Sequence, residues 1–116
     1  MDAKVSSLHI YPDSDSPGQE LDEVEITSSG PEGNRSKKHA VHLVSVDAYV
    51  ASYPKANVVI DVDTSTLDGM VGRVVRVGEC TLTITQKPSQ CAGVYAEVLE
   101  PGTVRVNDLL LLGDEG

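Results

Sequence analysis

Residues 71–85, VGRVVRVGECTLTIT, contain the pattern that decides the fold class. Two runs rich in β-branched residues flank Gly78 and Glu79, which predicts a hairpin whose arms cover 70–77 and 80–85. Along each arm apolar and polar side chains alternate, as is typical of a strand that is buried on one face. The side chains that we expect to face the core are Val75, Val77, Leu82 and Ile84.

Similar patterns, separated by turn residues, predict further strands along the chain. These strands cover 5–11, 23–27, 39–45, 57–62, 93–100, a short stretch after Pro101-Gly102, and 109–112. One helix is expected over 46–53, because apolar residues recur there at helical spacing and Pro54 blocks its continuation. Residues 63–69, DTSTLDG, are interpreted as a turn. The predicted fold is an all-β, mainly antiparallel closed barrel with one short α-helix, whose Tyr49 or Tyr53 closes one end.

The composition of the chain limits its size and its surroundings. At 116 residues it is long enough for one hydrophobic core, so we expect a single domain over 1–116. No apolar run approaches the roughly 20 residues that a membrane-spanning helix needs, and the first residues lack the pattern of a secretory signal. We therefore expect a cytoplasmic protein without a membrane partner.

The formal net charge of -9 argues against a nucleic-acid partner, because most of the surface would repel polyphosphate. Solubility is the simplest explanation of this acidity. Four of the nine basic residues nevertheless lie within 35–55, so a local cationic site is compatible with the acidic whole.

Several enzyme classes are excluded by missing motifs. The sequence contains no GxSxG elbow, no phosphate-binding GxxxxGK[ST] loop, no HExxH and no GxGxxG. His9, His39 and His42 have no spacing that would pair them on a helix as metal ligands. We therefore do not expect the histidines to form a metal site.

The two cysteines are expected to remain free thiols. Cys80 lies in the apolar phase of its strand, so we interpret it as a core residue. Cys91 follows a polar loop, and its small or polar neighbours would leave the sulfur accessible. A thiolate there could attack sulfur or bind a soft metal, which makes Cys91 the candidate catalytic residue and the candidate metal ligand. The alternative is a buried thiol with no chemical role.

The second candidate site is the loop at 33–39, GNRSKKH. Glycine and asparagine permit left-handed backbone, which can turn N–H groups towards an anion. Arginine offers a planar fork for a phosphate, and the lysines add positive charge. The alternative is an ordinary solvated basic loop. The candidate cofactor-binding residues are Gly33, Asn34, Arg35, Lys37, Lys38 and His39.

Four segments follow the order of a known family pattern. They are LDEVEITSSGPEGNR at 21–35, AVHLVSVDAY at 40–49, ANVVIDVDTSTLDGMVGRVVRVGECTLTIT at 56–85 and CAGVYAEVLEPGTVRVNDLLLL at 91–112. In these segments the chain resembles a MOSC domain, the C-terminal module of molybdenum cofactor sulfurases. The match GVYAEVLEPGTVRVND is specific, and GPEGNR is moderately so. Two positions depart from the family pattern: Asn34 replaces an Asp, and Ala56 replaces a Glu.

The resemblance implies a barrel related to that of pyruvate kinase and a role in molybdenum cofactor metabolism. The family's sulfur-carrying or molybdenum-contacting cysteine corresponds to Cys91, and its loop arginine corresponds to Arg35. The implied partner is a sulfur-donor protein or a molybdoenzyme. The chain has no cysteine desulfurase domain, so pyridoxal phosphate is not expected in it.

Two functional hypotheses stay open from the sequence. The first is a small MOSC-type protein that binds molybdenum cofactor, or a related anionic pterin or sulfur species, through Cys91 and the basic loop. The second is a binding or regulatory module that kept the fold and lost sulfur transfer, as the departures at Asn34 and Ala56 would allow. The sequence does not decide whether the protein is an enzyme, and it gives no oligomeric state.

Overall fold

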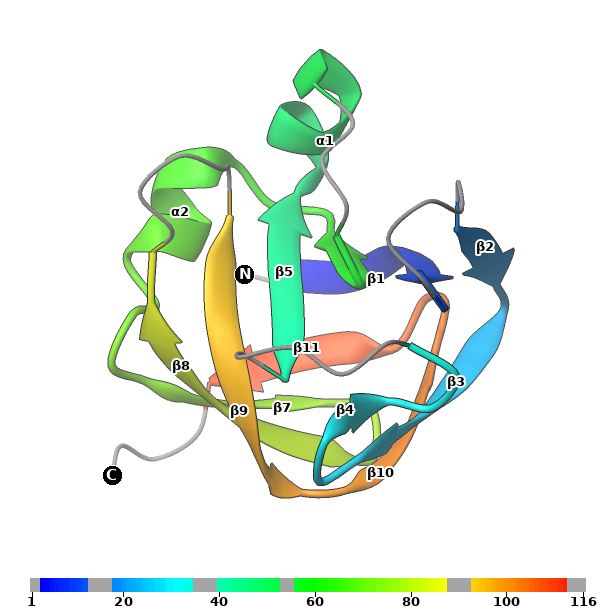
Figure 1. Ribbon diagram of the computed structural model, residues 1–116. Coiled ribbons are helices and arrows are strands. Elements are labelled where there is room, and N and C mark those ends of the chain that lie inside the picture. The colour runs from blue at the N-terminus through cyan, green and yellow to red at the C-terminus, as the bar shows by residue number, and fades with distance from the viewer. Residues whose placement is uncertain (1–2, 13–17, 35–39, 53–55, 88–92, 113–116) are drawn as a thin grey trace.

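The computed structural model describes residues 3–12, 18–34, 40–52, 56–87 and 93–112, and they form eleven strands and two short helices (Figure 1). The strands are β1 (Ala3–Ile10), β2 (Gln19–Leu21), β3 (Glu23–Thr27), β4 (Gly30–Pro31), β5 (Val41–Ser45), β6 (Val58–Ile60), β7 (Val74–Val77), β8 (Cys80–Gln86), β9 (Val94–Glu100), β10 (Gly102–Arg105) and β11 (Leu109–Leu112). The helices are α1 (Val46–Ser52) and α2 (Thr64–Asp68).

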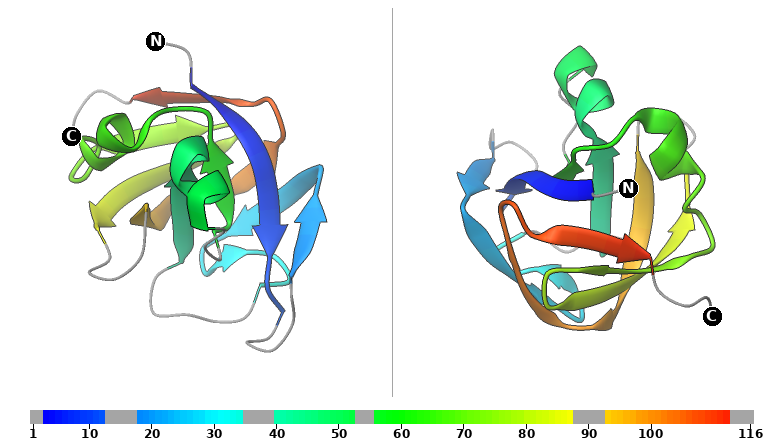
Figure 2. Two further views of the ribbon diagram at one scale, coloured as in Figure 1. Left: turned by 90° about the horizontal axis from the view of Figure 1, so that it is seen from above. Right: turned by 180° about the vertical axis from the view of Figure 1, so that it is seen from behind.

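Within the described residues, seven strands close into a barrel in the order β1, β11, β7, β8, β9, β5, β6 and back to β1. Strands β5 and β6 run parallel, and every other neighbouring pair in the barrel is antiparallel. Strand β2 extends the sheet by pairing with the second half of β1. The predicted all-β, mainly antiparallel barrel is therefore confirmed. Figure 2 shows the barrel from two further sides.

A smaller sheet of β10, β3 and β4 packs on the barrel at the lower side of Figure 1. Strands β3 and β10 are antiparallel, with Val24 opposite Val104. These two valines and Ile26 belong to the same hydrophobic cluster as the barrel core. The alternation expected in 23–27 is thus confirmed, since Val24 and Ile26 are buried and the glutamates beside them are exposed.

The central hairpin has the predicted register and faces. Val77 pairs with Cys80 and Val75 pairs with Leu82. The four side chains that were expected in the core, together with Cys80, are at most 2% exposed. Burying an aliphatic side chain of this size contributes about 1.5–3 kcal/mol, so the hairpin is a main source of barrel stability. Strand β7 begins only at Val74, because the preceding residues turn through Gly72, whose φ of 89° is left-handed.

Helix α1 begins at Val46, as the sequence predicted. Its Tyr49 packs against a small cluster of Val44, Ala56 and Val59, separate from the main core. Neighbouring residues of β5 and β6 belong to the main core, so α1 covers the outer face of these two strands. The expectation that Tyr49 closes one end of the barrel is therefore wrong, and Tyr53 lies outside the described residues.

Helix α2 was not predicted, since DTSTLDG was interpreted as a turn. The Asp63 carboxylate accepts hydrogen bonds from the hydroxyls of Ser65 and Thr66, which folds the segment back on itself. Leu67 then enters the main core with no exposed surface. Burial of this one leucine compensates for residues of low helix propensity. Neither helix in the described part of the chain is long and apolar enough to span a membrane.

Candidate functional site

The structure describes only part of the candidate site. Gly33 and Asn34 are described, and they follow β4. The remaining candidates lie outside the described residues: Arg35, Lys37, Lys38, His39 and Cys91. The described residues that lead into these segments define the surroundings of the site.

Gly33 adopts the left-handed backbone that the sequence predicted, with φ of 87°. A Cβ atom at this position would lie 2.9 Å from Ile10 Cδ1, so both conformation and space favour glycine. Asn34 does not share this conformation. Its side chain instead holds the turn against the end of β1, because Asn34 Oδ1 accepts a hydrogen bond of 2.7 Å from the Tyr11 backbone N–H.

Asn57 connects this turn with two barrel strands, and the sequence did not single it out. Its side chain is 1% exposed. Asn57 Oδ1 accepts from the His42 backbone N–H at 3.1 Å. Asn57 Nδ2 lies 3.3 Å from the His9 carbonyl oxygen and 3.3 Å from Asn34 Oδ1, and it donates to both. The only sequence signal was a polar residue at the start of the apolar run NVVI.

The backbone of Asn57 repeats these links. Its N–H donates to the His42 carbonyl at 2.9 Å, and its carbonyl accepts from the His9 N–H at 2.9 Å. Asn57 therefore stands between β1 and β5 at the point where β6 begins, and both its backbone and its side chain bond to each neighbour.

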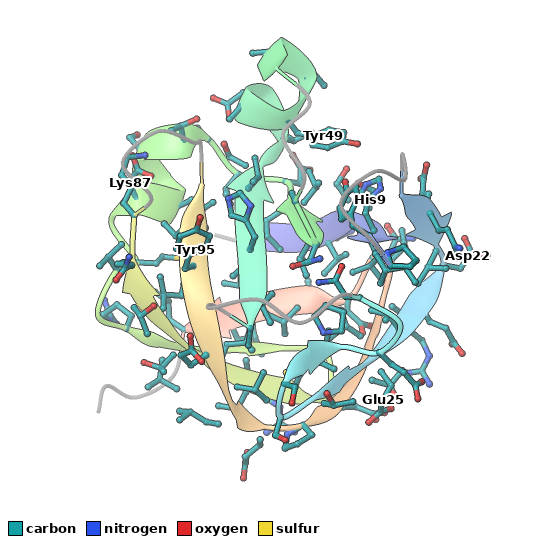
Figure 3. The ribbon with its side chains drawn as sticks, viewed as in Figure 1. His9, Asp22, Glu25, Tyr49, Lys87 and Tyr95 are labelled. Carbon is teal, nitrogen blue, oxygen red and sulfur yellow. The ribbon has the colours of Figure 1, made fainter. Side chains whose placement is uncertain are left out.

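An aromatic pair lies beside this network. The His9 ring stacks on Tyr49 of α1, with ring centroids 5.4 Å apart and planes inclined by 28° (Figure 3). Burial lowers the pKa of His9, although the charge of Glu20 opposes this. Burial, together with the neighbouring Tyr49, raises the pKa of Tyr11. Both shifts favour the neutral form at pH 7, so these rings supply a polar, uncharged surface.

The start of β9 packs against the same part of β5. Gly93, which follows Cys91 by two positions, has φ of 90°. A Cβ atom there would overlap the Leu43 carbonyl oxygen and lie 3.1 Å from His42 Nε2. The buried His42 ring is also 5.2 Å from the Tyr95 ring, at an angle of 54°. Only glycine fits at position 93, which fixes where the chain that carries Cys91 joins the barrel.

Cys80 is confirmed as a core residue with a free thiol. Burial, and to a smaller extent the negative charge of Glu25, raises the pKa of Cys80 to about 11. A thiol of this kind is neutral at pH 7 and has no accessible surface. Cys80 is therefore unsuited to sulfur transfer or metal binding.

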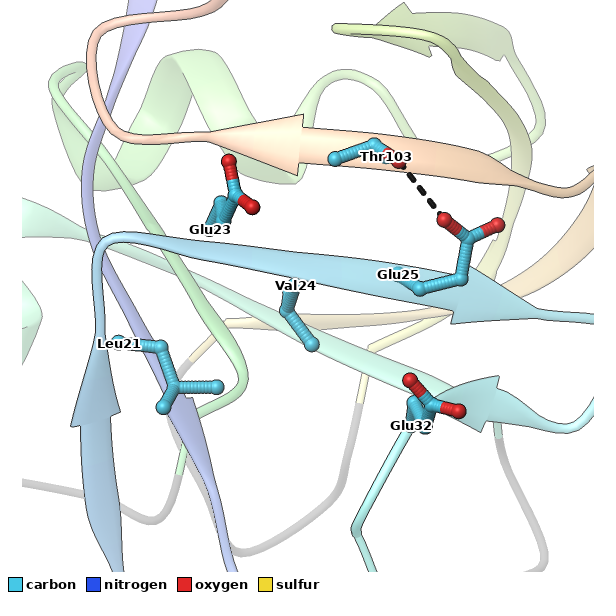
Figure 4. Close-up of a pocket in the computed structure, with 6 residues that line it drawn as sticks. All are labelled: Leu21, Glu23, Val24, Glu25, Glu32 and Thr103. Atoms are coloured by element: carbon cyan, nitrogen blue, oxygen red, sulfur yellow. Dashed lines mark hydrogen bonds between the residues drawn. The ribbon is translucent and has the colours of Figure 1, made fainter.

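A pocket at the smaller sheet, lined by residues of β2, β3 and β10 and by Glu32, has acidic walls (Figure 4). Its volume is about 270 Å³, and at its edge Thr103 Oγ1 donates to Oε1 of Glu25, the residue opposite it on β3, at 2.7 Å. An anionic cofactor would be repelled here, because three carboxylates face the space. Among the described residues, no group of three or more His, Cys, Asp or Glu side chains has the arrangement of a metal site. The pocket is lined by Leu21, Glu23, Val24, Glu25, Glu32 and Thr103.

A second pocket, of about 310 Å³, lies between α2 and the ends of β1 and β11. Its described lining is mainly aliphatic, including Met70 and Leu111, with Thr66 as its polar member. Among the described lining residues, one hydroxyl group is too few to orient a phosphate or a pterin.

Comparison with known proteins identifies the class of fold. No protein-family model and no curated protein matches the sequence. Solved structures do match, and they support a MOSC-like fold for this chain.

Three of these structures show the extent of the likeness. YiiM from Escherichia coli superposes with a TM-score of 0.70 at 17% identity, over 100% of this chain and 71% of that one. YiiM from Geobacillus stearothermophilus gives 0.71 at 12% identity, over 97% and 75%. The YuaD protein from Bacillus subtilis gives 0.74 at 13% identity, over 95% and 94%. At these identities the likeness concerns the fold alone.

Proposed function

We propose that this chain is a small MOSC-type protein that binds molybdenum cofactor, or a related anionic pterin or sulfur species, with Cys91 as a thiolate sulfur carrier or metal ligand. The MOSC-like fold and the family pattern in the sequence support the proposal. We further propose a cytoplasmic location and a sulfur-donor protein or molybdoenzyme as partner.

One observation carries the proposal. A continuous path of contacts joins the two segments that lead to the candidate residues. Gly93 packs against His42, the His42 N–H donates to Asn57, and Asn57 donates to Asn34. Cys91 precedes one end of this path by two positions, and Arg35 follows the other end directly. The described residues that flank the two segments, Asn34 and Gly93, thus belong to one region of the barrel, which supports the proposal that Arg35 and Cys91 serve one site.

The donor set suits the proposed ligand. Molybdopterin carries a phosphate and a dithiolene, and when bound it supplies the molybdenum centre for redox or sulfur chemistry. Arg35 would pair with the phosphate through its planar guanidinium, and Lys37, Lys38 and His39 would add positive charge. These cations would also favour the thiolate of Cys91, the form that attacks sulfur or binds a soft metal. The lowered pKa of His9 keeps its ring neutral at pH 7, so this ring adds no charge beside the turn that leads to the basic segment.

The hydrogen bonds of Asn34 favour a second function. In it the chain is a binding or regulatory module without sulfur transfer. The family has an acidic residue at this position, whereas the Asn34 carboxamide here accepts hydrogen bonds from Tyr11 and Asn57. A residue engaged in holding the turn adds no charge to a reaction. Such a module would keep ligand binding and lack the reaction of Cys91.

The test adds isolated molybdenum cofactor to the purified protein and measures bound chromophore after gel filtration. We expect wild type and a Cys80→Ala control to retain the chromophore. Sulfur loading from a persulfide donor should be lost in Cys91→Ser and kept in Cys80→Ala. Retained chromophore with no loading in wild type would support the second function. Absence of chromophore from wild type would contradict both.

A further inference from the structure

We propose that Asn57 is a positioning residue, which sets the place of the Gly33–Asn34 turn and through it the geometry of the anion-binding segment that follows. This inference rests on the proposed function, because it names the residue that orients the site. It also assigns a role to a side chain that the sequence pattern left as the start of a strand.

The hydrogen bonds of Asn57 leave it little freedom. One oxygen and one nitrogen of the carboxamide make three contacts, to His42, His9 and Asn34. The side chain is 1% exposed, so water cannot replace a lost partner without opening the site. The carboxamide plane is thus fixed by two barrel strands, and its third contact fixes the turn.

The turn depends on this third contact. Asn34 Oδ1 receives both the Asn57 Nδ2 donor and the Tyr11 backbone N–H, so a single atom joins the turn to β6 and to the end of β1. At the other end of the segment, Ala40 packs tightly on Gly30, where a Cβ atom would overlap the Ala40 carbonyl oxygen. Five residues, 35–39, connect these two anchored ends.

Position matters here because of the chemistry proposed for Arg35. A guanidinium that pairs with a phosphate through two parallel hydrogen bonds tolerates little displacement. Arg35 directly follows Asn34 in the sequence, so we expect a displaced turn to carry Arg35 away from its phosphate partner. Asparagine alone among the small residues offers one acceptor and two donors at this length. Aspartate would lose both donations and would bring a charge into a buried site.

The first measurement needs no ligand. Amide hydrogen exchange, followed by NMR, reports the stability of the Tyr11 N–H bond to Asn34. We expect Asn57→Ser to speed exchange at Tyr11 and Asn34 by about tenfold, as for the loss of one hydrogen bond. Ser45→Ala is the matched control, because Ser45 is also 1% exposed and its Oγ lies 2.9 Å from Thr64 Oγ1, away from the turn. Ser45→Ala should destabilise the fold as a whole and cause no extra increase of exchange at Tyr11 and Asn34 compared with the barrel strands.

The second measurement is the affinity for isolated molybdenum cofactor, well below the unfolding temperature of each variant. Asn57→Ser should bind about tenfold more weakly than Ser45→Ala. In a protein that already carries Asn34→Ala, Asn57→Ser should cause little further loss of affinity, because the hydrogen bond between residues 57 and 34 is already absent. Asn34→Asp keeps the acceptor oxygen and should restore most of the affinity that Asn34→Ala loses.

The outcomes separate the two ideas. Exchange at Tyr11 and Asn34 that is equal in Asn57→Ser and Ser45→Ala would overturn the positioning role, whatever the cofactor does. Additive losses of affinity in the double variant would also overturn it, since they would show that residues 57 and 34 affect binding independently. Faster exchange in a protein whose wild type binds no cofactor would overturn the proposed function, and with it the role of Asn57 in binding.

Discussion

The two cysteines are expected to differ in the fraction of thiolate that each carries, and thiol labelling at pH 8 can measure this difference. With a pKa of about 11, about one Cys80 side chain in a thousand is a thiolate at that pH. An accessible thiol with an ordinary pKa of about 8.5 is roughly one quarter thiolate. Nearby cations, which the proposed function requires, would raise that fraction for Cys91. Because the thiolate is the reacting form, Cys91 should react at least about 200-fold faster than Cys80. Burial of Cys80 widens the ratio further.

The assay mixes native protein with Ellman's reagent and follows the released chromophore. We expect one fast and one slow thiol in wild type. Cys91→Ser should lose the fast phase, and Cys80→Ala should lose the slow phase. Denaturant should bring the two rates together, since it removes the burial of Cys80. Two slow thiols in the native protein, or a disulfide between them, would refute the reasoning and remove Cys91 as the reactive group.

Three further predictions concern stability and binding. Leu67→Ala should lower the free energy of unfolding by about 2–5 kcal/mol in a urea titration, because the leucine is fully buried, whereas Leu99→Ala, at 53% exposed, should change it by less than about 0.5 kcal/mol. The raised pKa of Cys80 favours the neutral thiol in the folded state, so its contribution is complete below pH 9 and falls by about 2–3 kcal/mol as pH rises to about 11. This loss should disappear from the alkaline unfolding curve of Cys80→Ala. Arg35→Ala should weaken cofactor binding in a titration by about 1–3 kcal/mol, and Arg76→Ala should not.

The parts of the fold that sequence predicted correctly are those set by local pattern. The hairpin was predictable because alternation along β8 reports directly which side chains are buried. Gly33 was predictable as a left-handed residue because that freedom belongs to glycine itself. Helix α2 was missed because Thr64, Ser65 and Thr66 have low helix propensity, and its stability comes from Leu67 in the core. That burial depends on strands distant in the sequence.

Asn57 was also missed because its role depends on residues that are distant in the sequence. Its three side-chain partners belong to residues 9, 34 and 42, so no window of sequence contains them together. A single asparagine before VVI looks like the polar boundary of a strand. The network becomes visible only when the parallel pairing of β5 with β6 and the antiparallel pairing of β6 with β1 bring these residues together.

Charge changes sign across the turn that Asn57 holds. Glu32 lines the acidic pocket beside Glu23 and Glu25, and the next residue, Gly33, begins the turn. The basic run starts two positions later at Arg35. An anionic ligand is therefore repelled at the pocket beside β3, and under the proposed function it would be attracted by the basic run, although the protein as a whole carries a net charge of -9. In the sequence only Gly33 and Asn34 separate Glu32 from Arg35, so under the proposed function these two uncharged residues would join a repelling surface to an attracting segment.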